Sequence, residues 1–338
     1  MKAGQFDFAT KKAVVNDVPI PEPGPNQVLI KVKSASLCHS DLMPDFRPEG
    51  PPRTMGHEGV GVITKLHPSV EGRDFKVGDH VGAGYFVDAC FKCDGCLTHN
   101  MLCQTKTPRL QGFIADGFFA EYAIVEYENL AVLPKEVDLS RYAPVFCAGI
   151  TAFHAVDSCE LKPGEWLAVI GCGGLGQLAT QYAKAMGLKV VGIDVNDTTL
   201  EVTKAQGADA IFNSRSNPNY VAELKKLTDG GAHAAAVFSD ADAAYAHAPE
   251  VLRLRGLLMV VGLPKNPLKI TAVDLCIGKY RIKGESTSIP QRMKKAVDFT
   301  VKHGILPEVE FRKLEELQDM IDEMTEGKAT KRMAVVFD

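Results

Sequence analysis

The sequence lacks long hydrophobic runs, and it has few cysteines outside one short stretch. An apolar run of about eighteen residues, which a membrane helix would need, does not occur. The N-terminal "MKAGQFDFAT" also lacks an apolar stretch of signal-peptide length. We therefore expect neither a membrane span nor a secretion signal, and a cytoplasmic protein is the default expectation.

A dominant charge of one sign is also missing, because 38 Lys and Arg against 42 Asp and Glu give a net charge of −4. This balance gives no electrostatic reason to expect nucleic acid or an anionic membrane as a partner. The length of 338 residues predicts about two domains. Domains of that size bury full cores and need no disulfides to fold.

Four of the nine cysteines lie within the fourteen residues "CFKCDGCLTHNMLC", at Cys90, Cys93, Cys96 and Cys103. Gaps of two residues let neighbouring sulfurs turn toward one point, and a fourth thiolate after a short loop can complete a tetrahedral zinc site. Four thiolates leave no open position, which is typical of a structural zinc. The alternatives are chance clustering of buried cysteines and a redox C-x-x-C. The third and fourth cysteines and the missing thioredoxin-like context disfavour the redox motif.

The segment "EWLAVIGCGGLGQLATQYAKAMGLKVVGIDVND" predicts a dinucleotide-binding βαβ unit. Gly171, Gly173 and Gly176 fit G-x-G-x-x-G between an apolar strand and a helix expected over 175–186. Asp194 ends the next strand, where a carboxylate accepts hydrogen bonds from ribose hydroxyls and repels a 2′-phosphate. We therefore expect NAD rather than NADP. A glycine-rich turn in some other α/β protein is the alternative.

Strands and helices alternate as far as residue 285, with one helix expected over 241–252, which predicts a doubly wound parallel sheet over 148–285. Residues 1–147 instead contain short β-like runs, such as "QVLIKVKSAS", between Pro- and Gly-rich turns. The tail over 286–338 holds two helical patterns and the apolar strand "RMAVVF". The expected fold class is α/β, with a Rossmann sheet and a second, β-rich domain.

Cys38, His57 and Cys147 lie at the ends of predicted elements in "SASLCHSDL", "RTMGHEGVGVI" and "APVFCAGITAF". Two thiolates and one imidazole can hold Zn²⁺ and leave one position open, as catalytic zinc sites do. Taken singly, each cysteine also fits a small buried hydrophobe and the histidine a satisfied polar residue. Spacing alone leaves the choice open.

The whole chain resembles the zinc-dependent medium-chain alcohol dehydrogenases. The motifs that carry the resemblance are "CHSD" (38–41), "GHEGVG" (56–61), "GDHVG" (78–82), the cysteine cluster, "CAGIT" (147–151), "GCGGLG" (171–176), "VVGLP" (260–264) and "GKATKRMAVV" (327–336). It implies a GroES-like catalytic domain at 1–147 completed by 286–338, a Rossmann NAD-binding domain at 148–285, and an active site in the cleft between them. It also implies homodimers or homotetramers that pair through an edge strand near 256–264.

Position by position, the resemblance implies catalytic zinc on Cys38, His57 and Cys147. Asp41 would hydrogen-bond the His57 ring, and Glu58 would lie beside the metal. The zinc would act as a Lewis acid on the oxygen of an alcohol, aldehyde or ketone during hydride exchange with NAD.

Ser40 is the expected first acceptor of the alcohol proton. The resemblance further implies a set of cofactor contacts at the pyrophosphate, the nicotinamide and the Rossmann turn with its ribose partner. His39 and Arg332 would meet the pyrophosphate, and Thr151, Val261 and Leu263 would border the nicotinamide. The Rossmann turn comprises Gly171, Gly173, Gly174, Leu175 and Gly176, and Asp194 would be the ribose partner.

The sequence departs from the family pattern at several points. Met43 stands where many relatives carry a histidine that ends the proton relay, so we expect the proton to leave by water or another group. The loop from Cys38 to His57 is shorter than in familiar relatives, and six residues rather than seven separate the last two clustered cysteines. Tyr85 and Phe86 stand where pocket walls are often aromatic, which hints at apolar or aromatic alcohols; ordinary packing at a strand end explains them equally well.

Three other functions compete with an NAD-dependent alcohol dehydrogenase. A polyol or sugar-alcohol dehydrogenase would share the architecture. A non-catalytic NAD-binding sensor or structural protein would use metals only to hold its fold, and a zinc-free quinone reductase would have no use for the ligand set. The complete Cys38, His57 and Cys147 set disfavours the last two.

Overall fold

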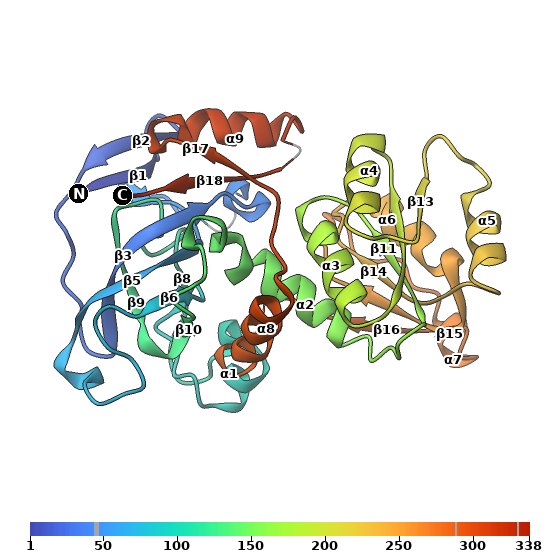
Figure 1. Cartoon of the computed structure of the whole chain (residues 1–338), viewed down its shortest axis with the longest axis horizontal. Coiled ribbons are helices and arrows are strands. Elements are labelled where there is room, and N and C mark those ends of the chain that lie inside the picture. Colours follow the sequence, from blue (N-terminus) through green and yellow to red (C-terminus); the bar gives the residue numbers. More distant parts are fainter. Residues whose placement is uncertain (44–46, 288, 330) are drawn as a thin grey trace. The chain divides into compact units, whose positions relative to one another are not determined.

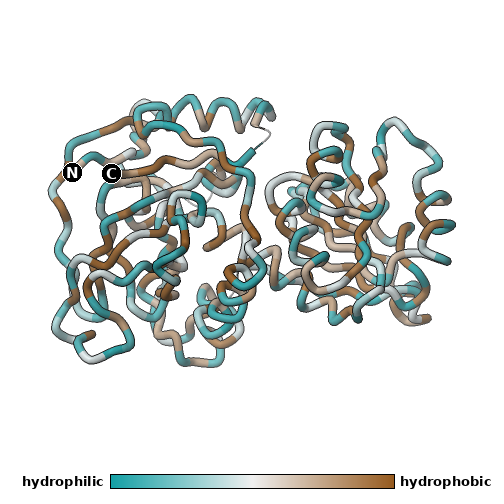
Figure 2. Tube along the Cα trace, viewed as in Figure 1, coloured by the Kyte–Doolittle hydropathy of each residue, from teal (hydrophilic) through white to brown (hydrophobic). Residues whose placement is uncertain are grey.

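A computed structural model describes residues 1–43, 47–287, 289–329 and 331–338. The chain divides into two compact units (Figure 1). The first comprises Met1–Cys147, Ser288–Lys302 and Leu306–Asp338, and the second comprises Ala148–Thr287 and His303–Ile305. Each unit has its own sheet and apolar core, and hydrophobic residues line the strands of both (Figure 2).

The first unit is built on a sheet in the order β10-β6-β5-β3-β18-β17, in which β9 also pairs with β3. Its strands are β3 (Gln27–Ser36), β5 (Glu58–Leu66), β6 (His80–Ala83), β9 (Tyr122–Glu126), β10 (Leu130–Leu133), β17 (Val309–Arg312) and β18 (Arg332–Val336). Strand β18 pairs antiparallel with β3, so the C-terminal tail completes the sheet that the N-terminal half begins.

Smaller elements surround this sheet. Strands β1 (Lys2–Asp7), β2 (Lys12–Asp17) and β4 (Arg53–Thr54) form one short sheet, and β7 (Phe86–Val87) pairs with β8 (Arg109–Leu110). The helices are α1 (Asp94–Thr98), α8 (Pro290–His303) and α9 (Leu317–Thr325), with 3₁₀ turns that include η1 (His39–Leu42), η4 (Asn100–Leu102) and η7 (Ala143–Phe146). Helix α9 packs its Leu317 on Gly4 of β1, where a β-carbon would come within 2.6 Å of the leucine side chain.

The second unit is a parallel sheet in the order β13-β12-β11-β14-β15-β16, the Rossmann order. The strands are β11 (Trp166–Ile170), β12 (Lys189–Asp194), β13 (Ala210–Asn213), β14 (Ala232–Val237), β15 (Leu252–Val260) and β16 (Tyr280–Gly284). The helices are α2 (Ala148–Asp157), α3 (Gly174–Ala185), α4 (Asp197–Ala205), α5 (Tyr220–Leu227), α6 (Asp242–His247) and α7 (Ala272–Cys276). The expected α/β class, with a Rossmann sheet and a β-rich partner, is confirmed.

Two details of the sequence-based fold are wrong. Strand β15 lies between β14 and β16, so the segment near 256–264 is not a sheet edge; the edge strand is β16. The single helix expected over 241–252 is instead α6 followed by the 3₁₀ turn η8 (Ala248–Val251). Pro249 lacks the N–H that would continue an α-helix.

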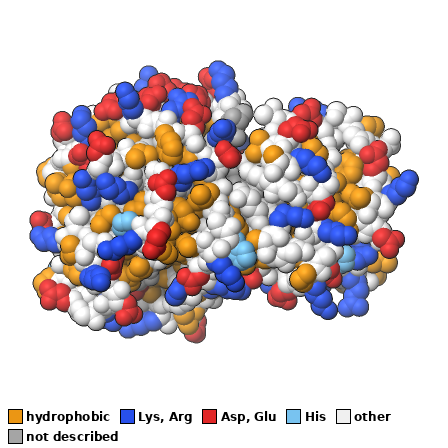
Figure 3. All heavy atoms as spheres, viewed as in Figure 1, with side chains coloured by type: hydrophobic (Ala, Val, Ile, Leu, Met, Phe, Trp, Pro, Cys, Tyr) orange, Lys and Arg blue, Asp and Glu red, His pale blue; other side chains and the backbone are white. Residues whose placement is uncertain are grey.

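The surface carries Lys, Arg, Asp and Glu side chains in mixture on the face shown in Figure 3. No helix among the described residues is long and apolar enough to cross a membrane.

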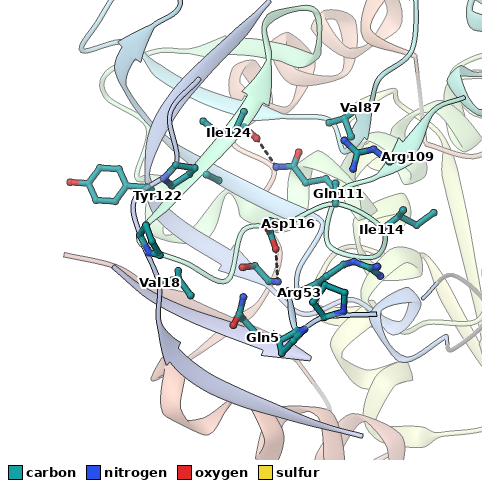
Figure 4. A pocket seen from close by; sticks show the side chains of 18 of the residues that line it. Gln5, Val18, Arg53, Val87, Arg109, Gln111, Ile114, Asp116, Tyr122 and Ile124 are labelled. Carbon is teal, nitrogen blue, oxygen red and sulfur yellow. Dashed lines mark hydrogen bonds between the residues drawn. The ribbon is translucent and has the colours of Figure 1, made fainter. Parts of the chain in front are cut away.

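A cavity of about 540 Å³ opens in the first unit, apart from every predicted site residue (Figure 4). Two of its polar side chains make hydrogen bonds to the backbone. Gln111 donates to the Ile124 carbonyl at 2.7 Å, and Asp116 accepts from the Thr54 N–H at 2.9 Å. The chemistry suggested by the sequence therefore has to be sought elsewhere in the unit.

Candidate functional site

Four buried side chains of the first unit converge on one point. The Cys38, His57, Glu58 and Cys147 donor atoms all lie within 4.8 Å of one another. The register of β3 against β5 places Ser36 opposite Glu58, so the residues that follow β3 and precede β5 meet at the same end of the sheet. Cys147 joins them from the end of η7. Strand pairing therefore assembles donors that are far apart in the sequence.

Asp41 fixes the orientation of the His57 ring. Its Oδ1 lies 2.9 Å from His57 Nδ1, and its Oδ2 accepts the Cys38 N–H at 2.9 Å. Burial lowers the pKa of His57, but the Asp41 carboxylate outweighs this effect and raises it well above its usual value. Within the described ranges, His57 Nε2 is buried without a hydrogen-bond partner. A buried, unpaired nitrogen that faces two thiols fits a metal ligand.

The two thiols of the cluster have pKa values that are shifted in opposite directions. A hydrogen bond from Cys147 holds the pKa of Cys38 well below its usual value, and the same bond raises the pKa of Cys147 well above it. Protein groups alone therefore favour one thiolate and one thiol. A divalent cation would allow both to ionise, so the donor set fits Zn²⁺ with two thiolates and one imidazole.

Glu58 is tied to the C-terminal tail by an ion pair that the sequence analysis did not anticipate. Its Oε2 accepts hydrogen bonds from Ser36 Oγ and from Arg332 Nη2, whereas Oε1 has no partner among the described residues. Burial raises the pKa of Glu58 to about 7, against the opposing effect of Arg332. Because Arg332 opens β18, the pairing of β18 with β3 brings the guanidinium to this carboxylate. Its predicted role at the pyrophosphate stays a prediction.

The η1 turn carries the other polar candidates of the first unit. Ser40 Oγ lies 3.9 Å from the Cys38 sulfur, and His39 is exposed in the same turn. Met43 follows the turn and carries no group that could transfer a proton. Ser40 therefore lies beside a candidate ligand, as the proton-relay prediction requires, while its role itself stays a prediction.

Two aromatic rings contact the His57 imidazole. The Tyr85 ring meets it edge-on at 4.8 Å between centroids, and the Phe113 ring lies 5.1 Å away. Phe86 stacks on Tyr85 and is only 3% exposed, so it belongs to the core. Sequence reasoning missed Phe113, because no motif marks the segment in which it lies.

The Cys90, Cys93, Cys96 and Cys103 sulfurs also converge within 4.8 Å. Cys93 caps α1 and accepts the Gln104 N–H at 3.3 Å. A hydrogen bond from Thr105 lowers the pKa of Cys90 to about 5, whereas burial raises that of Cys96 to about 12. The short gap before Cys103 does not prevent convergence, so this donor set fits a structural Zn²⁺.

The glycine turn of the second unit fits a dinucleotide pyrophosphate. Gly171 has a φ of +89°, and a β-carbon at Gly176 would lie 2.0 Å from the Gly171 carbonyl oxygen. A β-carbon at Gly173 would meet nothing within 4 Å, so this side of the turn, at the start of α3, is open to a ligand. Gly174 and Leu175 form the first turn of that helix.

Asp194 ends β12 and is hydrogen-bonded to the same glycine turn. Its Oδ2 accepts the Cys172 N–H at 2.6 Å, and its Oδ1 accepts the N–H groups of Val195 and Asn196 at 2.6 and 3.0 Å. A carboxylate accepts about four hydrogen bonds, so capacity remains for a ribose hydroxyl. The geometry is compatible with the predicted ribose contact.

The three residues expected at the nicotinamide all belong to the second unit. Thr151 is buried in α2, with its Oγ1 3.2 Å from Thr287 Oγ1. Val261 is 8% exposed just after β15, and Leu263 is 64% exposed. Their contact with a cofactor stays a prediction.

Comparison with known proteins connects these features to one family. Residues 24–135 match the family described as "Alcohol dehydrogenase GroES-like domain", and residues 174–302 match "Zinc-binding dehydrogenase". The chain is 35% identical to an alcohol dehydrogenase of Geobacillus stearothermophilus over 100% of both chains. It is 34% identical to one of Rhizobium meliloti (strain 1021), covering 96% of this chain and 95% of the relative. The crystal structure of the alcohol dehydrogenase from Aeropyrum pernix matches with a TM-score of 0.88 and 27% identity over 100% of both chains.

Proposed function

The chain belongs to the zinc-dependent medium-chain alcohol dehydrogenase family and is an oxidoreductase, and we propose that it exchanges hydride between an alcohol and NAD. The observation that carries this proposal is the buried Cys38, His57 and Cys147 set, in which His57 Nε2 faces two sulfurs. A zinc ion held there would supply Lewis-acid chemistry, lowering the pKa of a substrate hydroxyl or polarising a carbonyl. Hydride chemistry itself belongs to the nicotinamide.

Two side chains support the zinc ligands in this proposal. Asp41 fixes the His57 ring so that Nε2 is the ligand atom. Arg332 neutralises Glu58, which would otherwise add a full negative charge beside the two thiolates.

Ser40 takes the proton of the alcohol in this proposal, since its hydroxyl lies beside Cys38. Met43 cannot pass that proton on, so water or another group carries it to solvent. The pH dependence of turnover should then lack a step that depends on position 43, and Met43→Leu should leave the profile unchanged. A step abolished by Met43→Leu would contradict this route.

NAD is the proposed cofactor because Asp194 stands at the end of β12, where its negative charge disfavours a 2′-phosphate. The variant Asp194→Ser should lose roughly tenfold or more in kcat/KM with NAD, the loss typical of a charged hydrogen bond, and should gain activity with NADP. Wild-type protein that prefers NADP would contradict this assignment.

Apolar or aromatic alcohols are the proposed substrates, because the Tyr85 ring packs directly against the candidate ligand His57. A panel of primary, secondary and aromatic alcohols should therefore be oxidised faster than sorbitol or xylitol. Preference for sorbitol would instead identify the polyol dehydrogenase of the same architecture.

A second copy of the chain is the proposed protein partner, giving a homodimer or homotetramer. The support is a series of exposed apolar residues from β15 through the edge strand β16, since large exposed apolar areas mark interaction sites. These residues are Leu254, Leu263, Ile270, Val273, Leu275, Ile277 and Ile282. Light scattering of Ile277→Asp should show a smaller species than wild type; a monomeric wild type would contradict the proposal.

One assay tests the proposed function as a whole. Purified protein is screened with the alcohol panel and NAD or NADP while the nicotinamide absorbance is followed. Turnover that a chelator removes is the expected result. Tight NAD binding without turnover of any alcohol would favour the non-catalytic sensor.

A further inference from the structure

Arg47 is a buried cation in the short loop that joins Cys38 to His57. Its side chain is only 7% exposed. A guanidinium removed from water is costly unless its charge and its N–H groups are matched by partners. The partners of Arg47 therefore indicate what it is held for.

The first partner is Asp41, the residue that orients the His57 ring. Arg47 Nη1 donates to the Asp41 backbone carbonyl at 2.6 Å, and Nη2 lies 3.8 Å from Asp41 Oδ1. That same Oδ1 meets His57 Nδ1 at 2.9 Å. Arg47 thus contacts both the backbone and the carboxylate of the group that holds the imidazole.

The second partner is the segment at 112–113, which packs against His57. The guanidinium lies 5.3 Å from the centroid of the Phe113 ring, and Phe113 lies 5.1 Å from the imidazole. Arg47 Nη2 also donates to the Gly112 carbonyl at 3.5 Å. A β-carbon on Gly112 would come within 3.0 Å of the His57 backbone nitrogen, so this segment touches the ligand directly.

We propose that Arg47 is a positioning residue for the catalytic zinc, acting on His57 through Asp41 and Phe113. The inference rests on the zinc site of the proposed function. A planar guanidinium can stack on the Phe113 ring and donate in its plane to two carbonyls, whereas a lysine ammonium cannot. Outer partners of a metal-bound histidine set its ring orientation and ligand strength, so loosening them weakens metal binding.

The test compares Arg47→Gln with Arg53→Gln. Arg53 is a matched control, because it also lies over an aromatic ring, Phe8 at 5.4 Å, and donates to a backbone carbonyl, that of Pro48. No contact joins it to Asp41 or His57 among the described residues. The readouts are the rate of metal loss from the buried cluster to a chelator and the visible spectrum after Co²⁺ is exchanged into that cluster.

We expect Arg47→Gln to lose metal about tenfold or more faster than wild type and to show shifted cobalt bands. Arg47→Lys should show part of the effect, and Arg53→Gln should match wild type. If Arg47→Gln retains wild-type metal loss and spectrum, the inference is wrong. Should that variant fail to fold by circular dichroism, folded Arg47→Lys decides, and wild-type behaviour there overturns the inference.

Neither readout depends on turnover, so the two proposals fail separately. Wild-type protein that binds cobalt in the cluster but oxidises no alcohol would refute the dehydrogenase function and leave the role of Arg47 intact. Active wild type with Arg47→Gln indistinguishable from Arg53→Gln would refute only the role of Arg47. Protein that binds no metal in the cluster would refute both.

Discussion

The two donor clusters of the first unit differ in how the chain assembles them. The Cys90 loop gathers four sulfurs within fourteen consecutive residues, and three of the four are only partly buried. The other cluster draws Cys38, His57, Glu58 and Cys147 from three distant segments and buries all of them. The first needs only a turn and a short helix, whereas the second needs the finished sheet.

This difference in assembly corresponds to a difference in chemistry. Four thiolates around Zn²⁺ saturate the ion and leave it negatively charged, so it stabilises a loop and binds nothing further. Two thiolates and a neutral imidazole leave the ion neutral with an open position. A substrate oxygen can approach there, and the buried setting strengthens every electrostatic contact that it makes.

The largest expected effect is a loss of activity when a ligand of the buried cluster is replaced. Cys147→Ser should lower kcat/KM beyond the 10- to 100-fold that a change in an outer partner costs, because a ligand itself is lost. Cys159→Ser is the control, since this buried thiol belongs to neither cluster and donates to the Ala155 backbone carbonyl. Near-wild-type kinetics of Cys147→Ser would remove the distinction between the clusters.

The second prediction concerns stability. Cys103→Ser should destabilise the protein by more than about 3 kcal/mol, as loss of a structural metal does, and lower Tm by several degrees. Its folded fraction should keep wild-type kcat, because the loop does no chemistry. Calorimetry and kinetics on the same sample check this, with the exposed Cys276→Ser as control. An unchanged Tm would indicate that the loop holds no metal.

A smaller effect is expected at the partner of the histidine ligand. Asp41→Asn keeps the shape of the side chain but removes its charge, so affinity for the catalytic metal should fall by about 10- to 100-fold. Asp116→Asn is a suitable control, because Asp116 also accepts a backbone N–H but, within the described part of the chain, has no hydrogen bond to a donor of either cluster. Competition with a chelator measures both, and equal affinities would argue against the His57 contact.

Sequence patterns predict the candidate sites best where the chemistry is local. The spacing of Cys90, Cys93 and Cys96 and the glycines of the Rossmann turn each specify their structure within one short segment. The trio of Cys38, His57 and Cys147 could be proposed only by resemblance, because its assembly depends on the register of β3 against β5. That register is a property of the folded sheet.

Contacts that join the tail or a loop to the site could not be predicted. Arg332 reaches Glu58 because β18 pairs with β3, and no local pattern announces that pairing. The contacts of Arg47 and Phe113 could not be predicted either, since neither residue lies in a motif. The position of the segment near 256–264 in the sheet could not be predicted either, because the residues of one strand do not determine the order of the strands.

The smallest expected effect concerns Glu126, which contacts Asp88 just before the cysteine cluster. Glu126 accepts the Asp88 N–H, and burial raises its pKa to about 7 from 4.5. As the pH rises, the unfolded chain therefore releases the Glu126 proton before the folded protein does. Protonated Glu126 stabilises the fold below about pH 4.5, and this contribution is lost as the pH rises to about 7. Glu126→Gln should flatten this part of the stability profile by about 1 to 2 kcal/mol, after allowance for solvent screening. Parallel profiles of variant and wild type from urea unfolding would contradict the assignment.

The zinc content of freshly purified protein tests the central claim most directly, when wild type is compared with a Cys38→Ser, Cys147→Ser double variant. The account predicts two zinc ions per chain in wild type, and one zinc ion with no turnover in the folded variant. A wild type without zinc, or a variant that keeps both ions, would contradict it.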